Sequence, residues 1–141
     1  MDLSKFFSFL NTGTKEEDLD ENMETFKKTP YFKIGMFRKL IQNGLIFKNK
    51  VLILFSSMEG TMDVKDIDVA GDVMLYERAW YWISQVDWED EDWVNDLKIS
   101  SDLEFVKYLG LCISYFEGIE QFEKCAVLKK IQDFAKENLE D

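Results

Sequence analysis

The sequence predicts a mainly α-helical fold, arranged as a single compact domain over residues 1–141 and ending in an antiparallel helix pair. Three observations support this. Apolar residues recur at three- and four-residue spacing through most of the chain. Helix caps and stop signals separate these periodic segments. With 141 residues, 46% of them hydrophobic and 32% charged, the chain can form one core and is too apolar for general disorder.

Three helices are predicted in the first third of the chain. Residues 3–10, LSKFFSFL, place their large apolar side chains on one face and predict a short docking helix. Residues 14–28 predict a second helix, with acids in its first turns and lysines in its last, as the helix dipole favours. A third helix begins with Thr29 as N-cap and Pro30 at the first helical position, and we expect it to stop at Gly44.

The middle of the chain is harder to assign. Residues 45–55 contain two apolar runs, LIF and VLILF, and predict a small β-hairpin or a single buried strand, although runs this short do not distinguish strand from helix by periodicity. Residues 56–71, which include two glycines, are expected to be a loop. Residues 73–86, VMLYERAWYWISQV, hold the densest aromatic and aliphatic surface of the chain and predict a central, largely buried helix.

The C-terminal third predicts a helical hairpin. Ser101 and Glu104 form a predicted capping box, which opens a helix that ends at a glycine. Residues 122–139 predict the last helix, and the short connection makes the two helices antiparallel neighbours. Cys112 and Cys125 lie among apolar neighbours without a CxxC spacing, so we expect both to be reduced core residues.

The last helix carries a family-like pattern. Residues 122–131, FEKCAVLKKI, approximate the pattern FExAAxLRDxI, and over residues 115–134 the chain resembles the UVR-type hairpin of excision-repair and clamp-like proteins. That resemblance implies a hairpin that mediates protein–protein contact. Lys129 and Lys130 stand where the family has Arg-Asp. A tetratricopeptide-like hairpin fits nearly as well, and any amphipathic helix pair with small residues at a close crossing gives a similar pattern.

A second segment resembles a calcium site. Residues 66–77, DIDVAGDVMLYE, have the acids, glycine and final glutamate of an EF-hand loop. Ala70 and Met74 occupy the fifth and ninth positions and offer no side-chain ligand. We therefore expect no metal and no cofactor, and a degenerate EF-hand-like calcium-binding module is only a lower-ranked alternative.

Composition argues against catalysis and against a membrane protein. The chain has no histidine, which removes the commonest general base and the commonest zinc ligand, so we predict no enzyme and assign no catalytic residue. The longest uncharged apolar run, residues 51–55, is too short to cross a bilayer. Residues 1–10 lack a secretory signal pattern, so a cytoplasmic location is expected.

The net charge of −11 indicates the kind of partner. Residues 27–50 carry seven cationic residues and no acid, so the rest of the chain has a charge of −18. We interpret this basic band as the polar side of ordinary elements. A strongly acidic protein is repelled by nucleic acid and anionic lipid and is steered toward basic protein surfaces. We therefore expect a protein partner, with no direct nucleic acid and no membrane; the oligomeric state is left open.

The candidate partner-binding segment is residues 87–93, DWEDEDW. Exposed tryptophans beside dense negative charge would combine a binding anchor with electrostatic steering. The alternative is a solvated loop whose tryptophans fold back into the core. The predicted partner-binding residues are Asp87, Trp88, Glu89, Asp90, Glu91, Asp92 and Trp93.

These observations favour a small, acidic, non-catalytic binding protein that inhibits or neutralises a partner by covering its basic surface. Immunity proteins, antitoxins and phage counter-defence factors work in this way. The expected partner is a toxin, a nuclease or another nucleic-acid-handling protein. The alternative is a subunit or adaptor of a larger assembly, such as a phage assembly, that acts through the C-terminal helical hairpin.

Overall fold

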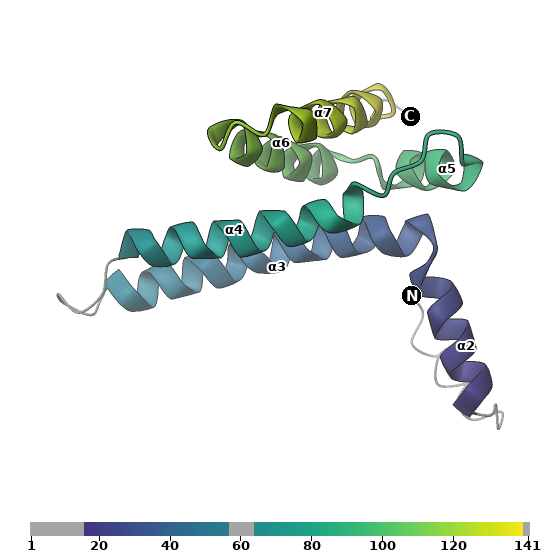
Figure 1. Cartoon of the computed structure of the whole chain (residues 1–141), viewed down its shortest axis with the longest axis horizontal. Coiled ribbons are helices and arrows are strands. Elements are labelled where there is room, and N and C mark those ends of the chain that lie inside the picture. The colour runs from purple at the N-terminus through teal and green to yellow at the C-terminus, as the bar shows by residue number, and fades with distance from the viewer. Residues whose placement is uncertain (1–15, 57–63, 140–141) are drawn as a thin grey trace.

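The computed structural model describes residues 16–56 and 64–139, and within these ranges every regular element is an α-helix (Figure 1). The mainly α-helical prediction is confirmed. The predicted docking helix at residues 3–10 lies outside the described residues. The helices are α2 (Glu16–Lys27), α3 (Pro30–Ser56), α4 (Val64–Ile83), α5 (Glu91–Ser100), α6 (Leu103–Gly118) and α7 (Phe122–Glu137).

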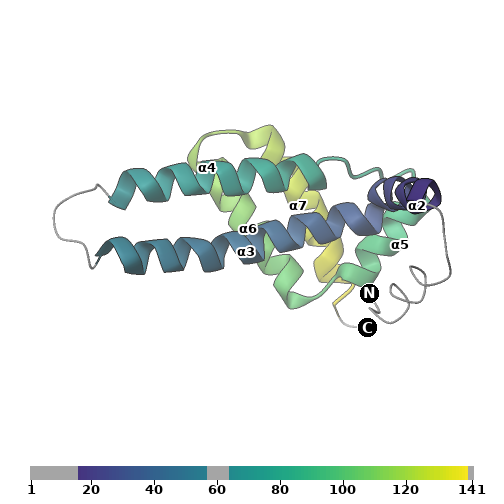
Figure 2. The same ribbon diagram turned by 90° about the horizontal axis from the view of Figure 1, so that it is seen from below.

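The helices are arranged in two layers. Helices α3 and α4 lie side by side and antiparallel in one layer, and the α6–α7 pair crosses one face of that layer (Figures 1 and 2). Helix α5 lies at the end where α3 begins, and α2 leaves this same end at an angle (Figure 1). At the other end α3 and α4 extend beyond α6 and α7. We call residues 40–56 and 64–78 the arm.

Helix α3 begins as predicted but does not stop where expected. The hydroxyl of Thr29 accepts a hydrogen bond from the backbone N–H of Phe32, with 3.2 Å between Oγ1 and N, and Pro30 is the first helical residue. The helix then continues through Gly44 to Ser56. The predicted β-hairpin or strand near residues 45–55 is therefore wrong. A Cβ at Gly44 would collide with the side chain of Leu75, so this glycine permits a close approach of α3 and α4.

The predicted loop over residues 56–71 is also wrong from residue 64 onward, because α4 already begins at Val64. The central segment 73–86 is helical only as far as Ile83. Burial is confined to one side of it, so the expectation of a largely buried helix holds in part. Its buried residues are Leu75, Tyr76, Ala79 and Ile83, and its exposed ones include Val73, Met74 and Tyr81.

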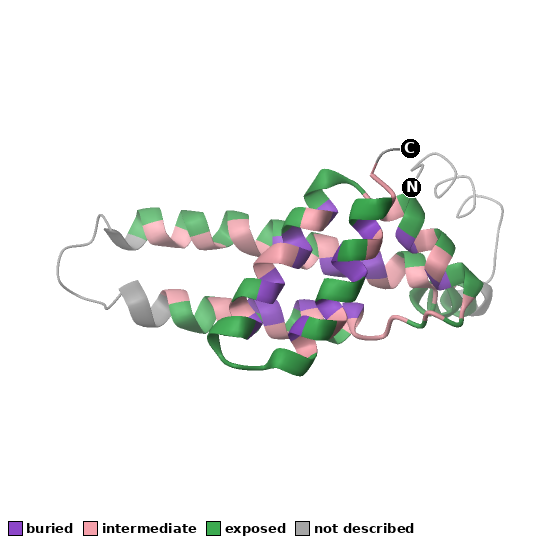
Figure 3. Cartoon of the chain, turned by 90° about the horizontal axis from the view of Figure 1, so that it is seen from above, coloured by how far each residue is buried: buried purple, intermediate pink, exposed green. Residues whose placement is uncertain are grey.

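The buried residues form one cluster where the two layers overlap (Figure 3). Aromatic rings from both layers meet inside it, and such pairs add about 0.5–1.5 kcal/mol each beyond the area they bury. Between the α3–α4 layer and α6 the ring pairs are Phe37–Phe105 at 5.9 Å, Trp80–Phe116 at 5.9 Å and Tyr76–Tyr115 at 4.8 Å between centroids. The outer part of the arm lies beyond this cluster.

The N-terminus of α6 is capped one residue later than predicted. Asp102 is the N-cap, and its Oδ1 accepts a hydrogen bond from the N–H of Phe105 at 2.8 Å. The hydroxyl of Ser101 instead donates to the carbonyl of Leu97, in the last turn of α5, at 2.6 Å. The predicted capping box is therefore wrong, because Ser101 already closes the preceding helix and the adjacent aspartate is the nearer acceptor.

The antiparallel pairing of α6 and α7 is confirmed, and so is the reduced, buried state of Cys112 and Cys125. The turn between the helices has the Schellman pattern. The N–H of Gln121 donates to the carbonyl of Phe116 at 2.9 Å, and the N–H of Glu120 donates to the carbonyl of Glu117 at 3.0 Å. Glu120 has a φ of 61°, in the left-handed region that glycine usually occupies at this position.

Candidate functional site

Two acidic segments lie at one end of the molecule. Helix α2 and residues 87–100 each contain six acidic residues and one lysine, so each has a charge of −5, and the four cations Lys28, Lys33, Arg38 and Lys39 around the start of α3 offset part of this charge. Both segments lie at the end where α3 begins (Figures 1 and 2). We call α2 and residues 87–100 the acidic end.

The two tryptophans of the predicted site point into the protein. Trp93 is only 4% exposed and belongs to the core. Trp88 is partly buried; its ring packs edge-to-face on Phe134 of α7, and Lys130 Nζ lies 4.9 Å from its ring centroid. The expectation that exposed indole rings anchor a partner is therefore wrong. Both rings instead fold back toward the core, and they attach α5 and the turn before it to the rest of the protein.

The five carboxylates of the predicted site divide into two kinds. Asp87 Oδ1 accepts from the N–H of Glu89 at 3.0 Å, and Asp90 Oδ1 caps α5 by accepting from the N–H of Asp92 at 2.9 Å. Glu89, Glu91 and Asp92 are exposed and make no ion pair with any residue of 16–56 or 64–139. Two carboxylates thus order the segment, and the others remain available to a partner.

Asp96 adds to the negative potential of this end. Its pKa is raised, chiefly because burial disfavours the charged form and further because the carboxylates of Asp92 and Asp90 lie nearby. The backbone N–H of Tyr31, in the first turn of α3, offsets part of this by donating to Asp96.

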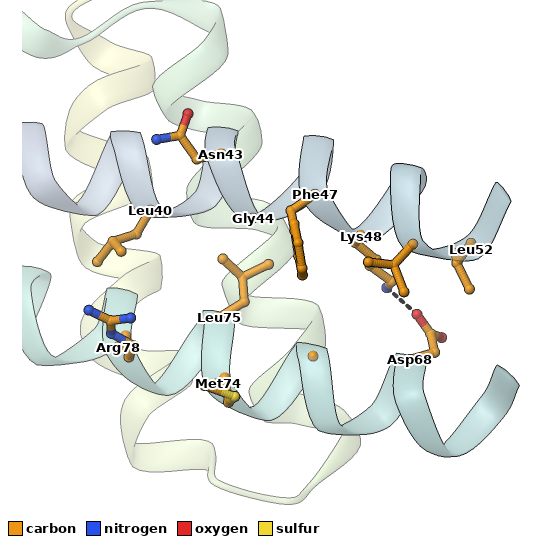
Figure 4. A pocket seen from close by; sticks show the side chains of 12 residues that line it. Leu40, Asn43, Gly44, Phe47, Lys48, Leu52, Asp68, Met74, Leu75 and Arg78 are labelled. Atoms are coloured by element: carbon orange, nitrogen blue, oxygen red, sulfur yellow. Dashed lines mark ion pairs between the residues drawn. The ribbon is translucent and has the colours of Figure 1, made fainter. Parts of the chain in front are cut away.

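A second candidate surface lies on the arm. An apolar groove of about 320 Å³ runs between α3 and α4 (Figure 4). Phe47 is 69% exposed and Met74 is 64% exposed, although both are large apolar side chains. The lining residues are Leu40, Asn43, Gly44, Phe47, Lys48, Val51, Leu52, Asp68, Gly71, Met74, Leu75 and Arg78.

The charged residues of the groove are unequally paired. Lys48 Nζ lies 2.9 Å from Asp68 Oδ1 and 2.8 Å from Asp72 Oδ1, so this lysine links α3 to α4. Burial lowers the pKa of Lys48, but the two carboxylates outweigh this effect and leave the pKa raised. Arg78, near the inner end of the groove, makes no ion pair within the described part of the chain. It is thus a cation available to an anionic group.

The predicted β-hairpin or strand near residues 45–55 does not lead to this groove, which forms because these residues continue α3 beside α4. One signal in the sequence indicates such a surface. If residues 45–55, LIFKNKVLILF, form a helix, their apolar side chains point in several directions around it, so a single contact with the core cannot bury them all. Phe47 points into the groove (Figure 4), whereas Ile46, one residue earlier, is exposed elsewhere on the helix.

The EF-hand-like segment does not form a loop. Residues 66–77 lie within the continuous helix α4, so the backbone turn that gathers calcium ligands is not formed there. Asp68 and Asp72 are paired with Lys48 instead. Among the described residues, no group of three or more cysteine, aspartate or glutamate side chains is placed to hold a metal ion.

The hairpin that resembles the UVR family is helical as expected, but its basic pair is not equally free. Both lysines are exposed, but Lys130 Nζ lies over the ring of Trp88. Ile119 and Phe122, beside the turn, are exposed apolar residues.

In the basic band, residues 27–50, Arg38 donates to the carbonyl of Ser100 at 2.8 Å and pairs with Asp102 at 2.9 Å, in agreement with a structural role.

Comparisons with protein-family models, with curated proteins and with solved structures found no match to this chain. Within the described ranges, none of the helices has the length and apolar character that crossing a membrane requires.

Proposed function

We propose that this protein is a small non-catalytic binding protein whose acidic end covers a basic surface of a partner protein. One observation carries the proposal: α2 and residues 87–100, each with a charge of −5, lie at the same end of the molecule. A concentrated field of this kind steers association and favours a complementary surface.

The proposed partner is a toxin, a nuclease or another nucleic-acid-handling protein, because such proteins expose basic surfaces that bind phosphates. Covering that surface would exclude nucleic acid and so inhibit the partner, as an immunity protein, an antitoxin or a phage counter-defence factor does. The same negative charge disfavours direct binding of nucleic acid by this chain.

The carboxylates and the tryptophans of residues 87–93 have different roles in this proposal. Glu89, Glu91 and Asp92 meet the partner, while Asp87 and Asp90 order the segment. Trp88 and Trp93 position these carboxylates through their packing in the body. Recognition at this end is therefore chiefly electrostatic, and it should weaken steeply as salt increases.

A charge-matched pair of variants tests the proposal. The first replaces Glu89, Glu91 and Asp92 by Gln or Asn. The control replaces three exposed glutamates of α6, α7 and their turn by Gln, so both variants lose three negative charges. The control positions are Glu117, Glu120 and Glu123.

Association with an immobilised arginine-rich peptide would be measured by surface plasmon resonance at low and high salt. We expect the first variant to associate about tenfold more slowly at low salt, with the control nearly unchanged. Equal slowing of both variants would show that only total charge matters and would overturn the proposal. A basic target identified later must also lose activity when this chain binds, since a fully active complex contradicts inhibition.

A second function is favoured by a different observation. The exposed apolar groove of the arm, with the exposed Ile119 and Phe122 beside the α6–α7 turn, suits a subunit or adaptor held in a larger assembly by apolar packing. Binding of that kind is nearly indifferent to salt. A partner whose association rate stays constant from low to high salt would therefore favour the adaptor over the inhibitor.

A further inference from the structure

The arm differs from the rest of the molecule in charge. Residues 40–56 carry two lysines and no acid, and residues 64–78 carry four acids with one lysine and one arginine. The arm therefore has a net charge of zero, or −2 when the connecting residues 57–63 are included, in a protein with a net charge of −11. Two copies of this chain repel one another over most of their surfaces, but two arms can approach without that penalty.

The groove face of the arm is also shaped to fit its own copy. On α4, Met74 projects from the surface, and three residues earlier a Cβ built on Gly71 would have no heavy atom within 4 Å. A prominent side chain thus lies beside an open position on the same helix face. A two-fold axis passing between these residues would place Met74 of each copy over Gly71 of the other.

We propose that the groove of the arm is a homodimer interface, in which two arms pack antiparallel about a two-fold axis near residues 71–74. Phe47 of α3, exposed along the same groove, would be covered in the same contact. Each copy buries the same patch, as an isologous interface requires.

The charges at the two ends of the groove fit this arrangement. Arg78 lies toward one end of the groove and Asp68 toward the other. The two-fold axis therefore places Arg78 of one copy opposite Asp68 of the other, with an offset along the helix of about one residue. The Asp68 side chain is 38% exposed, although its Oδ1 is buried beside Lys48. The otherwise unpaired arginine thereby gains an acidic neighbour at both ends of the interface.

The antiparallel direction is favoured by the acidic ends. Antiparallel arms place the two acidic ends at opposite extremes of the dimer, well beyond the screening distance of about 8–10 Å at physiological salt. A parallel arrangement would bring the two acidic ends, each with two segments of charge −5, to the same side of the dimer. This inference does not depend on the proposed binding of a basic partner, because it concerns the opposite end of the molecule.

Sedimentation velocity of the full chain tests the interface. We expect the wild type to sediment as a dimer, twice the chain mass of 16.7 kDa, at tens of micromolar. Met74→Asp and Phe47→Asp should each weaken dimerisation at least tenfold. The controls Ile99→Asp and Leu103→Asp place the same charge on residues that are 75% and 76% exposed away from the groove, and they should remain dimeric.

Gly71→Gln provides a variant that is expected to fold, because a Cβ at this position has no heavy atom within 4 Å and the rest of the side chain can extend into the open groove. It should be monomeric with an unchanged far-ultraviolet circular dichroism spectrum. A monomeric wild type at these concentrations would overturn the proposal. So would dimers that persist in Gly71→Gln, Met74→Asp and Phe47→Asp.

Cross-linking tests the direction of packing. Met74→Cys lies near the axis, and a short bismaleimide should join the two copies there. Tyr81→Cys lies two turns along the same helix and is also exposed, but antiparallel packing carries the two copies of residue 81 far apart, so no cross-link is expected. The native cysteines are buried. Equal cross-linking at both positions, or none at Met74→Cys, would contradict the antiparallel dimer.

Discussion

The indole ring of Trp88 packs edge-to-face on the phenyl ring of Phe134, with 5.3 Å between the ring centroids. This contact joins the acidic segment before α5 to the last helix, 46 residues later in the chain. It makes the tryptophan a positioning residue for the carboxylates around it. The exposed acids of residues 87–93 are therefore presented on a supported turn.

Trp88→Ala should lower the free energy of unfolding by about 1–3 kcal/mol, because it removes a partly buried ring and its aromatic partner contact. Urea unfolding measures this change. Phe122→Ala serves as the control, since Phe122 is an exposed aromatic residue and its loss should change the free energy by less than about 0.5 kcal/mol. Equal losses in the two variants would contradict the positioning role.

Asp102→Ala should cost about 1–2 kcal/mol at neutral pH, because Asp102 caps α6 and pairs with Arg38. Burial alone would raise the pKa of Asp102, but the N–H of Phe105 and the Arg38 guanidinium outweigh burial and lower it. A carboxyl with a lowered folded-state pKa contributes stability that is present above its unfolded value, about 3.9, and is lost as the pH falls through the folded value.

The stability difference between wild type and Asp102→Ala should accordingly shrink as the pH falls below about 4. Urea melts across this range would follow it. Glu104→Gln is the control, because Glu104 is exposed and its Oε2 lies 3.7 Å from Arg38 Nη2, so its loss should matter little at any pH. A difference for Asp102→Ala that is constant down to pH 2 would be inconsistent with the charged cap.

Gly35→Ala and Gly44→Ala should have different effects although both glycines lie inside α3. A Cβ at Gly35 meets no heavy atom within 4 Å, so alanine should stabilise the helix by about 0.5–1 kcal/mol. A Cβ at Gly44 collides with Leu75, which must move, and this cost should cancel the gain. Thermal unfolding of both variants measures the difference. Equal stabilisation would show that α3 and α4 are not in close contact there.

Glu120→Gly should stabilise the protein by about 0.5–1.5 kcal/mol, because a non-glycine residue at a φ of 61° is strained in the Schellman turn. The measurement is again urea unfolding. Ile119→Gly, one residue earlier at a φ of −105°, gains nothing from glycine and is the matched control. A loss of stability in Glu120→Gly would argue against this turn.

The local signals of the sequence predicted several elements correctly. Thr29 and Pro30 fix the start of α3 by hydrogen bonding and ring geometry that involve only neighbouring residues. The antiparallel α6–α7 pair follows in the same way from its periodic apolar residues and short connection. Cys112 and Cys125 lie in the apolar face of this pair and are buried as expected.

The errors have a different physical origin. Gly44 was predicted to end a helix, but its role depends on Leu75, which is 31 residues away in sequence. Likewise, the burial of Trp88 depends on Phe134 and Lys130 in the last helix, so the composition of DWEDEDW did not determine whether its indoles were exposed. Contacts between distant segments decided both outcomes.

The proposed binding of a basic partner is tested most directly by a nuclear magnetic resonance titration of the uniformly ¹⁵N-labelled chain with an arginine-rich peptide. We predict saturable shifts of backbone amides in residues 87–96 and in α2 that vanish at high salt. The amides around Glu117, Glu120 and Glu123, which are also exposed and acidic, should shift little. Shifts of equal size at both ends of the molecule, or shifts confined to residues 117–123, would contradict an acidic end that recognises a basic surface.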